Sequence, residues 1–313
     1  MKRALLFPGQ GSQAIGMGKE LCGAFQAAKD VFQEVDDALS QKLSLLMFDG
    51  SDADLKLTEN TQPALMAVSM AVIRVLEKQA GKKVSDLASY VAGHSLGEYA
   101  ALCAAGTFTL SDTARLLRKR GNAMQAAVPV GVGSMAALLG VDMQQAAEVA
   151  KEAAQGQVCA AANDNSVGQV VISGHKEAIE RAVVIAATKG FKRSVILPVS
   201  APFHCALMQP AADAMQEALA QVKMNAPVVP VIANVTATEQ TDVNEIRKLL
   251  VAQVTGAVRW RESMLYLKEK GVEAAIEAGS GTVLAGLMKR IDKDIQVTSL
   301  HTPQDIEAFL KIV

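Results

Sequence analysis

The pentapeptide Gly93-His94-Ser95-Leu96-Gly97 follows an apolar stretch at residues 87–92 and opens a helix-prone run at residues 96–102. A strand, a G-x-S-x-G turn and a helix form the context in which a serine is raised on a sharp bend as a nucleophile. The pattern alone is weak, since chance supplies it about once in ten chains of this length. The alternative is a glycine-rich helix start capped by Ser95. The flanking strand and helix favour the nucleophile.

The chain has 313 residues, of which 50% are hydrophobic and 4% aromatic, with a formal net charge of −1. This composition is typical of a globular α/β protein, and the scattered charges lack the basic patch of a nucleic-acid-binding protein. From these charges we expect no nucleic-acid partner. The four cysteines show no C-x-x-C spacing, so we expect reduced thiols and no metal site.

No stretch of the chain approaches the roughly 20 apolar residues that span a membrane. The first eight residues read as a strand ended by Pro8 rather than as a signal peptide, whose apolar segment is longer. These observations predict a cytoplasmic protein without membrane association.

The order of the predicted elements suggests two parts. Outside a central segment, strands and helices alternate, and they include a helix at residues 17–28 and strands at residues 87–92 and 228–233. This alternation predicts a largely parallel sheet with helices on both faces. Between Pro129 and Pro198 the order becomes β-α-β-β-α-β, the ferredoxin-like unit. We therefore expect an α/β-hydrolase-like domain of residues 1–128 and 198–313, interrupted by a ferredoxin-like subdomain of residues 129–197. Within the subdomain, residues 163–166 are expected to form a polar turn between strands.

Four histidines are candidates for the base that would activate Ser95. His94 adjoins the serine and is expected to support the bend, while His175 and His301 are expected to be structural or exposed. His204 lies in a proline-containing loop after a predicted strand, downstream of the serine as in α/β-hydrolases. It is therefore the preferred base, against the alternative of a structural histidine.

The helix predicted from residue 111 to residue 126 carries one inward-facing cation. Its apolar stripe is formed by Leu110, Ala114, Leu117, Gly121 and Met124. Arg120 falls about 60° from the centre of this stripe, at 100° per residue. A guanidinium near the interior needs a partner, and the simplest one is an internal Asp or Glu.

Five motifs of the chain occur in the order and spacing of one enzyme family. They are Phe7-Pro8-Gly9-Gln10-Gly11-Ser12-Gln13, Gly93-His94-Ser95-Leu96-Gly97-Glu98, Arg120-Gly121 with Met124-Gln125, Asn163-Asp164-Asn165, and Pro202-Phe203-His204. With them the chain resembles the malonyl-CoA:acyl carrier protein transacylases from Phe7 to about residue 290.

The resemblance implies a role for each matching residue. Ser95 would carry the malonyl group, and His204 would act as its base and later as an acid. The backbone carbonyl of Gln253 would orient this histidine. Arg120 would bind the substrate carboxylate, since a guanidinium matches a carboxylate bidentately. The backbone N–H groups of Gln10 and Leu96 would hold the oxyanion.

The resemblance also implies the reaction, in which malonyl passes from coenzyme A to serine and then to the phosphopantetheine thiol of acyl carrier protein. This would serve fatty acid biosynthesis, with the coenzyme A thioester as substrate, no bound cofactor or metal, and a monomeric enzyme. The alternatives are a serine esterase or thioesterase, a malonyltransferase of a polyketide or malonate-degrading system, and a non-catalytic module that binds acyl carrier protein. A basic rim for the acidic partner would comprise Lys189, Lys192, Arg193, Lys289 and Arg290.

Overall fold

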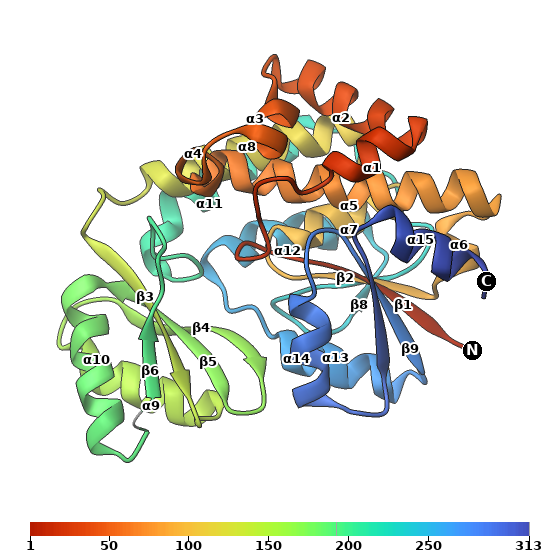
Figure 1. Ribbon diagram of the computed structural model, residues 1–313. Helices are drawn as coiled ribbons and strands as arrows, with labels where there is room; N and C mark the ends of the chain where they lie inside the picture. Colours follow the sequence, from red (N-terminus) through yellow and green to blue (C-terminus); the bar gives the residue numbers. More distant parts are fainter. Residues whose placement is uncertain (192, 313) are drawn as a thin grey trace.

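The computed structural model describes residues 1–191 and 193–312, which form two β-sheets with their helices (Figure 1). The larger sheet has the strand order β10 (Gln296–Leu300), β9 (Ala274–Ala278), β1 (Arg3–Phe7), β2 (Tyr90–Gly93), β7 (Val231–Ile232) and β8 (Glu239–Gln240). All pairs in it are parallel except β7 with β8. The protein therefore has an α/β fold whose main sheet is mostly parallel.

Helices cover both faces of this sheet, as the continuous apolar strands predict. Leu5 and Phe7 of β1 pack in one core with α5 (Thr58–Ala80) and α7 (Gly97–Ala104), together with α2 (Gln26–Leu39) and α8 (Leu110–Ala126). Ala4 and Leu6 face the other way, into a second core with α13 (Trp260–Glu269) and α14 (Val283–Ile291). Successive residues of one strand thus contribute to opposite layers.

The remaining helices of this part connect or flank the layers. They are α1 (Lys19–Ala24), α3 (Leu43–Asp49), α4 (Asp52–Lys56), α6 (Val84–Leu87), α11 (Gln209–Gln221), α12 (Val243–Thr255) and α15 (Pro303–Leu310), with a 3₁₀ turn at Ala206–Met208. Among the described residues, no helix has the length and apolarity needed to cross a membrane.

The smaller sheet is antiparallel, with the strand order β4 (Cys159–Ser166), β5 (Gln169–His175), β3 (Gly133–Leu139) and β6 (Arg193–Ile196). Helices α9 (Met143–Ala154) and α10 (Lys176–Thr188) pack against it around their own core, which includes Leu138, Val149 and Ile179. The elements follow one another in the predicted order β-α-β-β-α-β. Figure 1 shows this part beside the larger sheet.

The predicted polar turn at residues 163–166 is wrong. These residues extend β4, and the chain turns after Ser166 instead. Asn163 and Asp164 are buried, and the N–H of Asp164 donates to the carbonyl of Val258 in the larger part over 2.9 Å. Long-range pairing therefore overrides the local turn preference of these polar residues.

Two further local predictions differ from the structure. One helix was expected at residues 17–28, whereas α1 ends before Phe25 and α2 then continues to Leu39. The strand expected at residues 87–92 begins only at Tyr90, because α6 occupies the preceding residues. In both places helix caps that the periodicity does not reveal move the boundaries.

Candidate active site

Ser95 lies in the sharp turn between β2 and α7. Its φ is +53°, a conformation that costs free energy for a residue with a Cβ and is typical of functional sites. The flanking glycines are required by close packing, because a Cβ on Gly97 would lie 2.3 Å from the carbonyl oxygen of Phe7. Asn234 supports the turn, accepting from the Ser95 N–H at 2.8 Å and donating to the Gly93 carbonyl at 2.8 Å.

His204 faces the serine across 109 residues of sequence. Its Nε2 lies 2.8 Å from the Ser95 Oγ, and its Nδ1 lies 2.9 Å from the carbonyl oxygen of Gln253 and 3.2 Å from that of Gly256. Because Nδ1 faces two acceptors it carries the proton, which leaves Nε2 to accept from the serine hydroxyl. Burial, with the nearby Arg120 cation, lowers the pKa of His204 to about 3 and keeps it neutral.

The guanidinium of Arg120 is buried beside these two groups. Its Nη1 donates to Gln62 Oε1 over 2.8 Å, and its Nη2 donates to Gln253 Oε1 over 2.8 Å and to Ser95 Oγ over 3.2 Å. Its Nε has no partner in the described part of the chain. The internal carboxylate considered as its simplest partner is wrong: no ion pair of Arg120 exists among the described residues. Desolvation instead lowers the pKa of Arg120.

Neutral side chains hold Gln62, the acceptor of the Arg120 Nη1 hydrogen bond, in place. Gln62 Nε2 donates to Thr58 Oγ1 over 3.0 Å, and Thr58 Oγ1 donates to Gln10 Oε1 over 3.0 Å. This chain of hydrogen bonds joins the guanidinium to the loop after β1. It fixes Arg120 without neutralising the positive charge.

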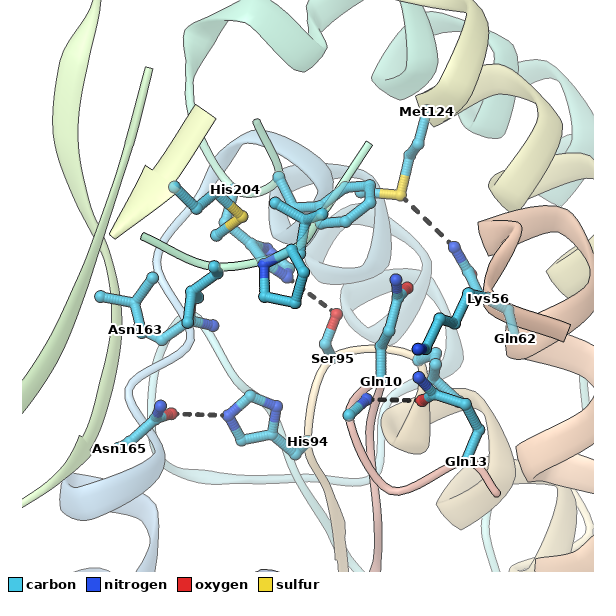
Figure 2. A pocket seen from close by; sticks show the side chains of 18 of the residues that line it. Gln10, Gln13, Lys56, Gln62, His94, Ser95, Met124, Asn163, Asn165 and His204 are labelled. Atoms are coloured by element: carbon cyan, nitrogen blue, oxygen red, sulfur yellow. Dashed lines mark hydrogen bonds between the residues drawn. The ribbon is translucent and has the colours of Figure 1, made fainter. Parts of the chain in front are cut away.

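A cavity of about 280 Å³ opens over Ser95 between the two sheets. Figure 2 shows Ser95 and His204 facing each other within it, with Gln10 on the opposite side from Asn163. Gln10 and Leu96 line this cavity, and their backbone N–H groups donate no hydrogen bond among the described residues. Leu96 directly precedes α7, and free N–H groups at the start of a helix suit an anion, while the N–H of Gln10 comes from the loop after β1.

The structure brings Ser95, His204, Arg120, Gln10, Leu96 and Gln253 together around one hydroxyl. The other histidines do not contact the Ser95 hydroxyl in the described part of the chain. His94 lines the cavity and its Nε2 lies 2.8 Å from Asn165 Oδ1, and His175 Nδ1 accepts from the Val158 N–H at 2.9 Å. His301 pairs with Asp305 at 3.2 Å.

The predicted basic rim is not part of this cavity. Lys189 pairs with Glu152 at 2.9 Å, and neither it nor Arg193, Lys289 or Arg290 lines the cavity. Lys192 lies outside the described residues.

Sequence reasoning missed Gln62 and Asn234. Asn234 directly follows the strand predicted at residues 228–233, and a polar residue at the carboxyl end of a parallel strand is a signal that could have found it. Gln62 sits among polar residues at the start of the long apolar helix α5, where it is fully buried.

Comparisons with known proteins agree with this geometry. The chain matches the acyl transferase domain family over residues 4–301. It is 44% identical over 309 residues to the malonyl CoA-acyl carrier protein transacylase of Escherichia coli strain K12, covering 99% of each chain. The crystal structure of the acyl-carrier-protein-S-malonyltransferase of Bartonella henselae superposes with a TM-score of 0.97 at 58% identity, covering 100% of this chain and 99% of that one.

A malonyl-transacylase solved in complex with a type II PKS acyl-carrier protein superposes with a TM-score of 0.96 at 41% identity, covering 99% of both chains. The family predicted from the motifs is confirmed over nearly the whole sequence. The chain therefore belongs to the acyl transferase domain family and, within it, to the malonyl CoA-acyl carrier protein transacylases.

Proposed function

We propose that this protein transfers a malonyl group from coenzyme A to the phosphopantetheine thiol of acyl carrier protein, through a malonyl ester on Ser95. The observation that carries the proposal is the buried Arg120 guanidinium, which lies 3.2 Å from Ser95 Oγ and has only neutral hydrogen-bond acceptors. A desolvated cation that bonds no carboxylate directly favours a ligand that supplies one. The free carboxylate of a malonyl group does so.

The first half-reaction acylates the serine. His204 Nε2 takes the proton from Ser95 Oγ, and the oxygen attacks the thioester carbonyl. The N–H groups of Gln10 and Leu96 stabilise the resulting oxyanion, at roughly 3 kcal/mol for each donor. The C–S bond then breaks, and the coenzyme A thiolate takes the proton from His204. The backbone carbonyl of Gln253 orients the imidazole throughout.

The second half-reaction reverses these roles for a different thiol. His204 removes the proton from the phosphopantetheine thiol, whose sulfur attacks the malonyl ester. Collapse of the second tetrahedral intermediate breaks the bond to Ser95 Oγ, which recovers the proton from His204. All reacting groups come from one chain, and we propose a cytoplasmic monomer that uses no metal or bound cofactor.

Arg120 selects the acyl group. A malonyl carboxylate can accept two parallel hydrogen bonds from the guanidinium, whereas an acetyl group leaves this cation buried without an anion. Leaving a buried charge unpaired costs on the order of 2 to 5 kcal/mol, a discrimination of about thirtyfold or more.

We also propose a division of the chain into two domains. Residues 1–128 and 198–313 would form an α/β-hydrolase-like domain, which the parallel sheet and the serine turn after β2 support. Residues 129–197 would form an inserted ferredoxin-like subdomain, supported by the antiparallel order of β4, β5, β3 and β6. The cavity would then lie where the two domains meet.

The pathway is proposed from the relatives. Fatty acid biosynthesis is the preferred assignment, and the solved complex with a type II PKS acyl-carrier protein supports supply to a polyketide system as the second candidate. The two are distinguished by comparing malonyl transfer to carrier proteins of each type from the same organism.

The decisive experiment incubates the protein with malonyl-CoA and maps the adduct by peptide mass spectrometry. We expect a malonyl mass on Ser95, released as malonyl thioester when acyl carrier protein is added. Ser95→Ala should carry no adduct, whereas Ser89→Ala, a serine just before β2, should retain it. An adduct on another residue, or its absence, contradicts the proposal. Release of free malonate faster than transfer to the carrier protein would identify a thioesterase instead.

A further inference from the structure

Glu98 is a buried carboxylate that the mechanism above does not use. It lies in the first turn of α7, three residues after the nucleophile, and is only 2% exposed. Its Oε2 accepts from the Asn234 N–H at 3.1 Å and from Gln253 Nε2 at 2.7 Å. A buried carboxylate is costly, so its place beneath the active site calls for a reason.

The Gln253 side chain connects this carboxylate to the substrate-binding cation. Its Nε2 also donates to the Ser95 carbonyl at 3.0 Å, and its Oε1 accepts from Arg120 Nη2 at 2.8 Å. An ionised carboxylate accepts hydrogen bonds and cannot donate them. When Glu98 is protonated, Oε2 can still act as the acceptor, because it already accepts from the Asn234 N–H and the proton can sit on the other oxygen. In both protonation states the NH₂ group of Gln253 therefore faces Oε2, which turns the amide oxygen toward Arg120. The reversed amide would direct its NH₂ group at the guanidinium and lose these hydrogen bonds.

We propose that Glu98 is a positioning residue that, through the Gln253 amide, holds the Arg120 guanidinium beside Ser95 and thereby sets the preference for a carboxylated acyl group over acetyl. This inference rests on the proposed function, since it concerns how the same site chooses its acyl group. It adds a residue that contacts neither substrate nor the reacting atoms.

The charge of Glu98 adds a second, separable effect. Arg120 faces it from α8 and Tyr99 neighbours it on α7, while α12 and the segment after β7 present the neutral Gln253 and Asn234. Burial raises the pKa of Glu98 to about 7. Above that pH its negative charge competes with the malonyl carboxylate for the field of Arg120. The KM for malonyl-CoA should therefore rise severalfold between pH 6 and 8.5, while the KM for acetyl-CoA stays constant.

The test compares two variants of Glu98 with a buried control. Glu98→Leu removes the acceptor, and Glu98→Gln retains an oxygen that the Asn234 N–H holds in place but removes the charge. Glu277→Gln is the control, because Glu277 is also buried but bonds the N–H groups of Leu284 and Ala285 and does not line the cavity over Ser95. Each protein is assayed for kcat and KM with malonyl-CoA and acetyl-CoA from pH 6 to 8.5, after thermal unfolding verifies its fold.

Glu98→Leu should lower the malonyl-to-acetyl ratio of kcat/KM at least about tenfold, mainly through the malonyl KM, the loss expected when a hydrogen bond to a charged group is disturbed. Glu98→Gln should keep the ratio within about threefold of wild type at pH 6 and abolish the rise of the malonyl KM with pH. Glu277→Gln should change neither quantity.

Three results would overturn the inference. They are equal loss of both substrates in Glu98→Leu, an unchanged ratio in that variant, and a pH-dependent malonyl KM that persists in Glu98→Gln. If Glu98→Leu does not fold, the pH profile of the isosteric Glu98→Gln decides alone. Failure of the proposed function itself is recognised separately, because wild-type protein would then form no malonyl adduct on Ser95.

Discussion

Two arginines of this protein are held in opposite ways. Arg261 on α13 forms a fork with the buried Asp164 of β4, its Nε lying 3.1 and 3.0 Å from the two carboxylate oxygens and its Nη2 2.9 Å from Oδ2. Arg120 is more deeply buried yet bonds only amide and hydroxyl oxygens. The bond to Asp164 raises the pKa of Arg261, whereas desolvation lowers that of Arg120.

The difference separates a structural cation from a binding one. The Arg261–Asp164 pair joins the two sheets, alongside a backbone hydrogen bond of 2.8 Å from the Val258 N–H to the carbonyl of Ala162. Arg120 bonds no carboxylate directly, and it lines the cavity over Ser95. A buried cation that bonds no carboxylate of the protein directly is therefore the stronger indication of a ligand.

The largest effect is expected at the binding cation. Arg120→Ala should lower kcat/KM for malonyl transfer by roughly 100-fold to 1,000-fold, because the substrate carboxylate loses its buried cationic partner. Acetyl transfer should persist or rise, since no desolvated charge then lies in the cavity. Steady-state rates with both thioesters measure the effect. Arg115→Ala, an exposed arginine of the same helix, is the control. Equal loss on both substrates would make Arg120 structural and erase the contrast.

The structural pair should affect stability instead. Asp164→Ala leaves Arg261 partly buried without its anion and should lower the free energy of unfolding by about 3 kcal/mol. Denaturant unfolding measures this change. The malonyl-to-acetyl ratio of the folded variant should stay close to wild type, since Asp164 does not line the cavity over Ser95. A changed ratio at constant stability would assign Asp164 to substrate selection.

The third prediction concerns the pH dependence of stability, which depends on Glu98, a buried carboxylate that lacks the direct ion pair of Asp164. Glu98 has no ion pair among the described residues, and its pKa rises from 4.5 to about 7 on burial. The folded protein therefore binds a proton that the unfolded chain has lost between these pH values, so stability falls as pH rises through this window, by up to about 3 kcal/mol. Glu98→Gln should be more stable than wild type by that amount at pH 8 and nearly equal at pH 4.5. A pH-independent difference would contradict the assignment.

The smallest effect is expected for one neutral acceptor of Arg120. Gln62→Leu removes one hydrogen bond to the guanidinium and should raise the malonyl KM by about tenfold, because Gln253 still holds the cation. Initial rates over a range of malonyl-CoA concentrations measure it. Gln33→Leu, an exposed glutamine of α2, should leave the KM unchanged. A loss as large as that of Arg120→Ala would show that Gln62 and Gln253 do not share the positioning of the guanidinium.

Much of the local structure could be read from the residues because its causes are local. The apolar run of β1 and the β-α-β-β-α-β order of residues 133–196 match the predicted strands, since periodicity reports which face is buried. The prediction for residues 163–166 was wrong because the cause of their structure is not local. Their polar side chains indicate a turn, whereas pairing with β5 and contacts with Val258 and Arg261 make a buried strand favourable there.

The candidate site divides along the same line. The glycine-flanked turn at Ser95, the downstream His204 and the inward face of Arg120 follow from motif, order and helical spacing, and the family follows from five motifs together. The hydrogen-bond partners of Arg120 do not follow from these patterns, because Gln62 and Gln253 lie 58 and 133 residues away in the sequence. The helical position placed this arginine near the interior and suggested an acid beside it. The packing of α5, α8 and α12 supplied neutral amides instead, because no local pattern records which side chains meet when distant helices pack.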